Sequence, residues 1–122
     1  MSPRMVATVA AVASLVFGML GLILPTAIAA ALGGSVDATG GALLRLACSS
    51  YVAFGVLTFL ARDLTDAGAW RAVSAASAVS WGLGAVVVAI GTLSALVGVQ
   101  AWFVVAMQIL FTLAWSRVYA RA

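Results

Sequence analysis

Four stretches of the chain are apolar for about twenty residues each, and this length limits what the chain can fold into. They cover residues 5–24, 42–61, 70–91 and 101–118. An α-helix of that length crosses the roughly 30 Å hydrocarbon core of a bilayer. The composition agrees, since 66% of the 122 residues are hydrophobic, 7% are charged and the mean hydropathy is +1.24. We therefore predict an all-α fold in which residues 1–122 form one domain, an antiparallel bundle of four transmembrane helices.

The first apolar stretch follows a basic N-terminus, an order that also occurs in secretory signal peptides. Residues 5–24 are longer than the apolar part of such a signal, so we expect a retained transmembrane helix. Pro25 should end this helix, and residues 26–32 should form one or two further helical turns at the membrane interface. The connections between the stretches are short, so sequential helices should run antiparallel.

The arginines predict the orientation of the bundle in the membrane. Those on the side shared by the two termini and the middle connection are Arg4, Arg62, Arg71, Arg117 and Arg121. Only Arg45 falls on the other side, and cytoplasmic segments are the ones enriched in Arg and Lys, so both termini should be cytoplasmic. A dual-topology protein is the alternative. The bias toward Ala, Val and Leu and the absence of Lys indicate a high-GC bacterium, which places the protein in the plasma (inner) membrane of a bacterial cell.

The composition also limits the chemistry of the chain. It contains no His, no Glu and one cysteine, Cys48, so it offers no intrachain disulfide, no Cys/His metal cluster and no histidine ligand for haem. We predict no metal and no cofactor. The six Arg and three Asp are too dispersed for the basic stripe of a nucleic-acid-binding protein. The expected partners are membrane lipid, an apolar small molecule, and a second copy of the chain or a larger membrane complex.

Each predicted span carries polar or amphipathic side chains near its middle. They are Ser14 in the first, Tyr51 in the second, Ser80 and Trp81 in the third, and Gln108 in the fourth. Unpaired polar groups are costly in hydrocarbon, so these should turn inward and bond to one another or to a ligand. Packing between helices is the first interpretation, and a ligand cavity bounded by the flat Trp81 ring is the second. Small residues at helical spacing, such as Ser14, Gly18 and Gly21, favour close packing inside the bundle over a dimer face.

Arg45 lies about one turn inside the second predicted helix, with Cys48 and Ser49 on the same face. Its side chain can extend to the lipid headgroups, or it can pair with Asp37 in the adjoining connection. Such a pair would orient the guanidinium at the outer mouth of a cavity, where it could bind an anion or a polar headgroup. The residues predicted to bind a ligand are therefore Arg45, Asp37, Ser49, Tyr51, Trp81, Gln100, Trp102 and Gln108, with Asp37 as the acid if the protein is an enzyme.

A faint repeat relates residues 64 positions apart. Phe17-Gly18 matches Trp81-Gly82, Leu32 matches Leu96, Gly34 matches Gly98, and Tyr51 matches Trp115. A chain rich in Ala, Val, Leu and Gly also produces such matches by chance. A true duplication would give two parallel hairpins related by a pseudo-twofold axis along the membrane normal.

The order of three segments is familiar. The first span ends with FGMLGLILP, the sequence ALGGSVDATGGALLRL follows, and the second span closes with YVAFGVLTFLARD. With Pro25, Asp37, Gly40 and Arg45 in these places, the chain resembles the small uncharacterised four-span integral membrane proteins of actinobacteria and other high-GC bacteria. The resemblance implies a four-helix fold and no established activity, so it assigns no catalytic residue.

Three functions remain open from the sequence. We favour a non-catalytic membrane protein that binds a lipid or an apolar metabolite, or an accessory membrane subunit, because the usual catalytic residues are absent. The first alternative is a membrane-embedded cyclase or isomerase acting on a lipid-soluble isoprenoid or polyketide, with Asp37 as its acid. The second is a small-molecule exporter, although proton-coupled exporters need a carboxylate within the membrane and all three Asp lie outside the predicted spans.

Overall fold

The computed structural model describes residues 2–122, which form five helices and no strand. The helices are α1 (Pro3–Ile23), α2 (Pro25–Ala31), α3 (Ala38–Ala61), α4 (Ala67–Leu93) and α5 (Ala101–Arg121). All except α2 are long and apolar enough to cross a membrane. The prediction of an all-α fold with four helices of membrane-spanning length is therefore confirmed.

Pro25 explains the break between α1 and α2. Proline has no N–H with which to continue α1, and its fixed φ fits the first turn of α2. The short helix ends at Ala31, and Gly33, two residues further on, has a φ of 75°, which glycine adopts without strain. Gly34 N then donates to Ala29 O at 2.9 Å, which closes the end of α2. The short helix predicted after the first span is confirmed.

The three aspartates all have structural roles at helix ends. Asp37 and Asp66 cap α3 and α4, since each carboxylate accepts a hydrogen bond from the backbone N–H three residues later, at 2.7 and 2.6 Å. Asp63, in the connection between α3 and α4, pairs with Arg4 at 2.9 Å and with Arg62 at 3.3 Å. The Arg4 pair joins the start of α1 to that connection.

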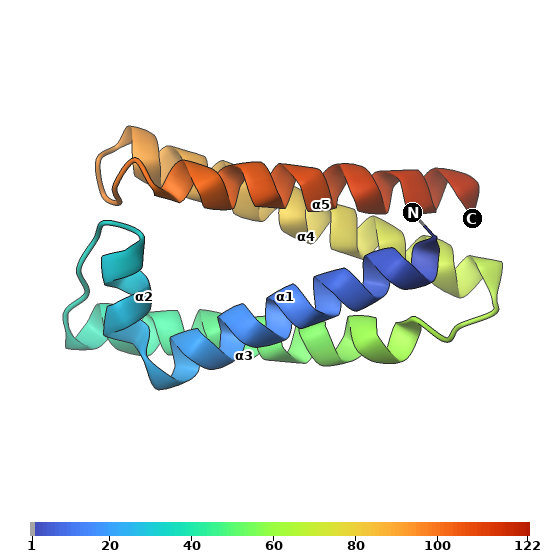
Figure 1. Ribbon diagram of the computed structural model, residues 1–122, viewed down its shortest axis with the longest axis horizontal. Coiled ribbons are helices and arrows are strands. Elements are labelled where there is room, and N and C mark those ends of the chain that lie inside the picture. The colour runs from blue at the N-terminus through green and yellow to red at the C-terminus, as the bar shows by residue number, and fades with distance from the viewer. Residues whose placement is uncertain (1) are drawn as a thin grey trace.

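The four long helices form two hairpins, α1 with α3 and α4 with α5 (Figure 1). Contacts within each hairpin are far more extensive than contacts between hairpins, including those between α3 and α4. Both termini and the α3–α4 connection lie at one end of the bundle (Figure 1). A core of buried side chains joins the hairpins, and Val6, Trp70, Trp81, Trp115 and Val118 belong to it.

Small residues allow α1 and α3 to approach closely. A Cβ atom on Gly18 would lie 2.9 Å from both Cys48 O and Val52 N, and one on Gly21 would collide with the Cys48 side chain. Both glycines are buried. The stripe of Ser14, Gly18 and Gly21 therefore packs inside the hairpin, as the first interpretation of the sequence proposed.

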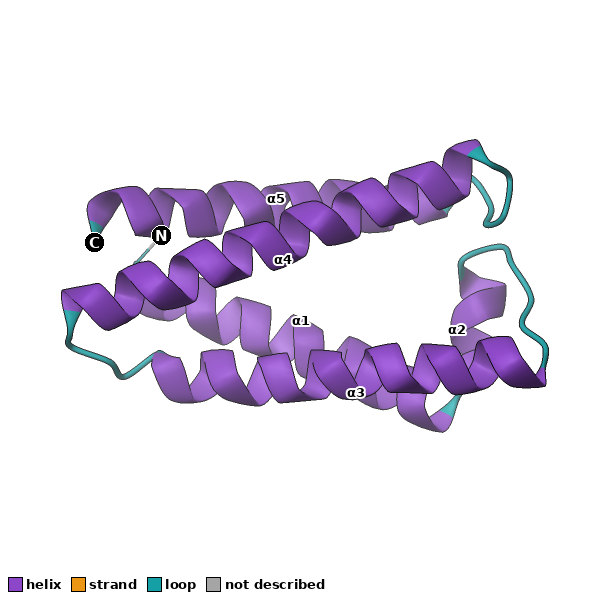
Figure 2. Cartoon of the chain, turned by 180° about the vertical axis from the view of Figure 1, so that it is seen from behind, coloured by secondary structure: helices purple, strands orange, loops and turns teal. Residues whose placement is uncertain are grey.

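The hairpins diverge toward the end that carries α2 (Figure 2). At this end the connection after α2 meets the connection before α5, because Gly98 N donates to Leu32 O at 2.7 Å. The side chain of Gln100 packs against Gly33 and Gly98 in the same place. The two connections therefore close the space between the diverging hairpins at one end, and the buried aromatic core closes it at the other.

The two hairpins have the same chain direction, since α1 and α4 both begin at the end of the bundle that holds the termini, as a duplication would require (Figure 1). Pro3 and Ala67, the first residues of α1 and α4, are 64 positions apart (67 − 3). Equivalent positions also make equivalent contacts. Gly18 packs against Cys48, while Gly82, 64 positions later, packs against Thr112, which is 64 positions after Cys48. These contacts support the pseudo-twofold arrangement.

Candidate functional site

A cavity of about 280 Å³ lies between the two hairpins on the diverging side of the core. All four long helices and the connection after α2 contribute side chains to its wall. The lining residues are Ala13, Phe17, Leu32, Leu44, Ala47, Tyr51, Trp81, Val87, Val88, Val104, Met107 and Gln108. Only Tyr51, Trp81 and Gln108 carry polar side-chain atoms, so the cavity is apolar with one group of polar atoms.

Helical spacing explains why each helix gives a narrow stripe to the wall. Ala13 and Phe17 are four residues apart on α1, and Ala47 and Tyr51 are four apart on α3, so each pair shares a face. On α5, Val104 and Gln108 repeat the pattern. The remaining faces of these helices point into the hairpins or toward the membrane.

Trp81 forms an aromatic wall of the cavity and is 4% exposed. It stacks on Phe111 with ring centroids 4.6 Å apart and meets Tyr51 edge-on at 6.2 Å. Phe54 contacts Trp81 in the same edge-on manner at 6.1 Å, and Phe17 contacts Tyr51 at 5.3 Å. These edge and stacked contacts orient the rings of the wall relative to one another.

Gln108 is the most polar residue of the wall, and its side-chain amide is incompletely hydrogen-bonded. It is 2% exposed, and its Nε2 makes one long hydrogen bond, donating to the Tyr51 hydroxyl at 3.4 Å. Within residues 2–122, Gln108 Oε1 and Trp81 Nε1 are buried without a partner. Turning the amide over would leave the NH2 group short of partners instead. Both atoms belong to residues that line the cavity.

A second hollow, of about 340 Å³, lies between α3 and α4. It is lined by Ala47, Ser50, Tyr51, Phe54, Ser80 and Trp81. Three of these residues, Ala47, Tyr51 and Trp81, also line the cavity. The prediction that Ser80 lies inside the bundle is wrong, since Ser80 is exposed. Trp81 takes the buried position, and successive residues of a helix point about 100° apart.

Arg45 and Asp37 do not form the predicted pair. Within residues 2–122 the only ion pairs are those that Asp63 makes, and Asp37 caps α3 through Gly40 N. Arg45 lies about two helical turns further along α3, and its Nε donates to Leu22 O near the end of α1 at 3.1 Å. The prediction of an Arg45–Asp37 ion pair is therefore wrong, since each side chain satisfies a nearby helix end.

The other predicted ligand residues are spread over the molecule. Ser49 is exposed and donates to Leu46 O at 2.7 Å, and Gln100 packs between the two connections. Trp102 lines a separate apolar groove between α4 and α5. The structure thus brings Tyr51, Trp81 and Gln108 together at the cavity and leaves Arg45, Asp37, Ser49, Gln100 and Trp102 outside its wall.

Sequence reasoning missed Phe17 and all the aliphatic lining residues. Phe17 had a usable signal, because it is the counterpart of Trp81 in the 64-residue repeat. The aliphatic residues had none, since a residue facing an apolar cavity and one facing lipid look alike in a sequence.

No group of three or more His, Cys, Asp or Glu side chains in the described part of the chain is placed to hold a metal ion. Comparison with known proteins finds no protein-family model, curated protein or solved structure that matches the chain. The resemblance to four-span proteins of high-GC bacteria stays a prediction from the sequence.

Proposed function

We propose that the protein binds, in the cavity between its two hairpins, a lipid-soluble small molecule that is mostly apolar and carries one hydrogen-bonding group. The observation that carries this proposal is the convergence of Tyr51, Trp81 and Gln108 on a cavity that is otherwise apolar. Small-molecule sites usually have this composition, with a few placed polar groups in an apolar wall. Binding lets the protein hold such a molecule away from the bulk lipid.

The unpartnered atoms indicate the polar group of the ligand. In this proposal the hydroxyl of the ligand donates to Gln108 Oε1 or accepts from Trp81 Nε1, since both atoms belong to lining residues and are buried without a partner. A buried polar atom left without a partner costs about 1–3 kcal/mol, and a ligand that pairs with it removes that cost. No arginine lines the cavity, so a neutral alcohol fits it better than an anion.

The hollow between α3 and α4 supplies the route of entry in this proposal. It shares part of its wall with the cavity, and in this proposal it opens to the membrane. Contacts between α3 and α4 are few, so this seam separates at less cost than the tightly packed hairpins. Ser50 and Ser80, which line the hollow, provide hydroxyls along the route. The ligand therefore enters from the bilayer rather than from water.

Decanol and decane test the proposed recognition of a hydroxyl. A ligand that binds only the folded state raises the Tm, so decanol should raise the Tm of the detergent-solubilised protein more than decane does. Gln108→Leu should keep or raise the basal Tm and abolish the preference for decanol, because it removes the polar group but keeps an apolar side chain of similar size. Ile109→Leu, on the lipid-facing side of α5, should behave as wild type.

A cavity-filling variant tests the location of binding. Ala47→Phe places a ring in the wall that the cavity and the hollow share, whereas Ala53→Phe places the same ring on an exposed position of α3 that lines neither. The Tm shift with decanol should disappear in the first variant and persist in the second. An equal shift in both variants would refute binding in the cavity.

A further inference from the structure

The end of the bundle that holds both termini contains a second group of polar side chains, made of arginines. Arg4 and Arg62 both pair with Asp63. Arg117 and Arg121 have no acidic partner within residues 2–122. They lie one turn apart on α5, so two like charges share a face and repel each other weakly, and an anion bound between them would remove that repulsion.

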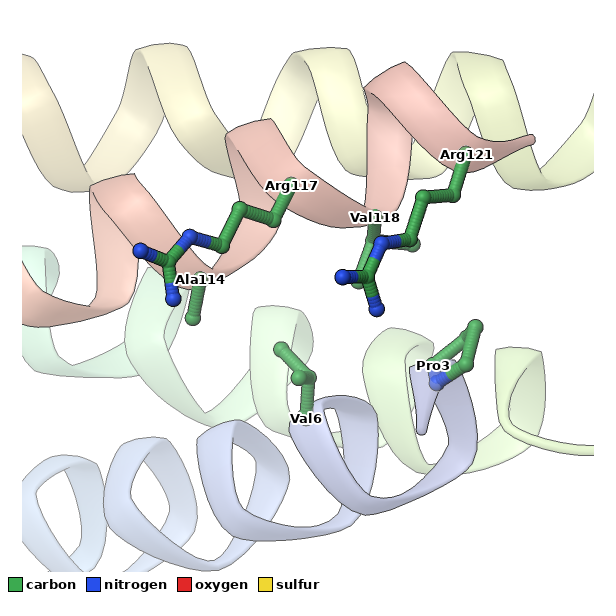
Figure 3. Close-up of a pocket in the computed structure, with 6 residues that line it drawn as sticks. All are labelled: Pro3, Val6, Ala114, Arg117, Val118 and Arg121. Atoms are coloured by element: carbon green, nitrogen blue, oxygen red, sulfur yellow. The ribbon is translucent and has the colours of Figure 1, made fainter. Parts of the chain in front are cut away.

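The two arginines border a small pocket between α5 and α1, which Figure 3 shows. Its volume is about 100 Å³, and it is lined by Pro3, Val6, Ala114, Arg117, Val118 and Arg121. The base of the pocket is apolar, since Val6 is 2% and Val118 4% exposed. The guanidinium of Arg121 extends into the space between α5 and the start of α1 (Figure 3).

An apolar groove adjoins this pocket on the outer face of α5. It has a volume of about 520 Å³ and shares Ala114 and Arg117 with the pocket. Its other lining residues are Met107, Leu110, Phe111 and Leu113. Residues 107 to 117 of a helix rise about 15 Å, which is half of the roughly 30 Å hydrocarbon core. The groove therefore begins at the arginines and runs through one leaflet.

We propose that Arg117 and Arg121 bind the phosphate of an anionic phospholipid whose acyl chain lies in the groove along α5. The planar guanidinium of arginine matches phosphate oxygens in two-point hydrogen bonds. Two uncompensated positive charges favour a headgroup with net negative charge over a zwitterionic one. The apolar groove favours a lipid over free phosphate, which has no chain to fill it. This site is separate from the cavity between the hairpins and does not depend on the function proposed for it.

Native mass spectrometry of the detergent-solubilised protein tests the headgroup. Equal amounts of phosphatidylglycerol and phosphatidylcholine with the same acyl chains are added, and the retained lipid is counted. Wild type should retain one phosphatidylglycerol in preference, and Arg117→Gln combined with Arg121→Gln should reduce that preference about tenfold. Arg71→Gln is the control, because Arg71 lies at the same end with its guanidinium over the Tyr119 ring, 5.5 Å from the centroid. Equal retention of both lipids by wild type, or an equal loss in Arg71→Gln, would overturn the proposal.

The acyl chain has its own pair of variants. Leu110→Trp should fill the groove and lower phosphatidylglycerol retention several-fold, although both arginines remain. Leu46→Trp alters a side chain on α3 that is equally exposed, at 67%, and should have no effect. Glycerol phosphate, a headgroup without chains, should not displace the bound lipid. If it does, the site recognises free phosphate and the assignment to a phospholipid is wrong. Unchanged Tm values in the arginine variants will show that lost retention is not lost folding.

Discussion

Trp81 occupies the boundary between the packed core and the cavity. On one side it belongs to the buried cluster with Trp70 and Trp115, and on the other it lines the cavity with Tyr51 and Gln108. Because its ring packs against Phe111, Tyr51 and Phe54, the fold sets the orientation of Trp81 before a ligand arrives. Such preorganisation lowers the entropic cost of binding.

For single residues, the sequence predicted which polar side chains are buried, but it did not predict the groups to which they bond. An amide in a transmembrane helix is costly in lipid, so the buried position of Gln108 followed from chemistry alone. The predicted Arg45–Asp37 pair does not form, because the N-terminus of α3 binds the carboxylate and the backbone carbonyl of Leu22 binds the guanidinium. An Asp directly before a helix is a common N-cap, so the role of Asp37 could have been read from the sequence, whereas the Leu22 carbonyl that Arg45 contacts could not.

Gly18→Ala tests the close approach of α1 and α3. The added methyl group would lie 2.9 Å from backbone atoms of α3, which cannot turn aside as a side chain can, so we expect a loss of about 1–3 kcal/mol in stability. Gly41→Ala is the matched control, because nothing lies within 4 Å of its added methyl group. Its stability should stay the same or rise, since alanine favours a helix more than glycine does. Thermal unfolding in detergent measures both, and equal Tm values for the two variants would contradict the packing described here.

At the scale of elements, hydropathy located the helices well because each long helix needs a complete apolar span. The predicted span 42–61 and α3 (Ala38–Ala61) end at the same residue, and the predicted span 101–118 and α5 (Ala101–Arg121) begin at the same residue. The larger differences lie where polar or small residues continue a helix beyond the hydrocarbon, as in the first turn of α3 after the Asp37 cap.

Arg45 connects two elements, and its replacement should act on their packing. Its Nε supplies a donor to Leu22 O near the C-terminus of α1, where a positive charge also interacts well with the helix dipole. Arg45→Leu should therefore lower the stability by about 1 kcal/mol without changing the effect of decanol on the Tm. The stability of Arg45→Lys, which keeps the charge, should lie between that of wild type and that of Arg45→Leu. Loss of the decanol effect with an unchanged basal Tm would instead restore Arg45 to the list of ligand residues.

At the scale of the whole molecule, sequence reasoning could not find the cavity. A bilayer is about as apolar as a protein interior, so residues facing lipid and residues facing the cavity are chosen from the same set. Val87 lines the cavity and Val86 lines the outer groove between α4 and α5, although they are adjacent and identical in type. Adjacent residues of a helix point about 100° apart, and the space that Val87 borders exists because the two hairpins diverge, which depends on contacts between distant parts of the chain (Figure 2).

The orientation of the molecule in the membrane stays a prediction from its arginines. Single cysteines at Ser35 and Thr65, in a Cys48→Ala background, lie at opposite ends of the bundle in exposed positions. A membrane-impermeant thiol reagent applied to intact cells should label the Ser35→Cys site, and it should label the Thr65→Cys site only after the membrane is permeabilised. The reverse pattern would place the termini outside, and partial labelling of both sites would indicate dual topology.

The position of a bound alcohol tests the central claim most directly. Crystals of the protein soaked in a bromine-labelled decanol would report the bromine by anomalous scattering and the hydroxyl by its density. We predict the bromine in the cavity between the hairpins and the hydroxyl within about 3 Å of the Gln108 side chain. Bromine found only on the lipid-facing surfaces of the helices, with no alcohol density beside Tyr51, Trp81 and Gln108, would contradict the claim that the cavity binds the alcohol.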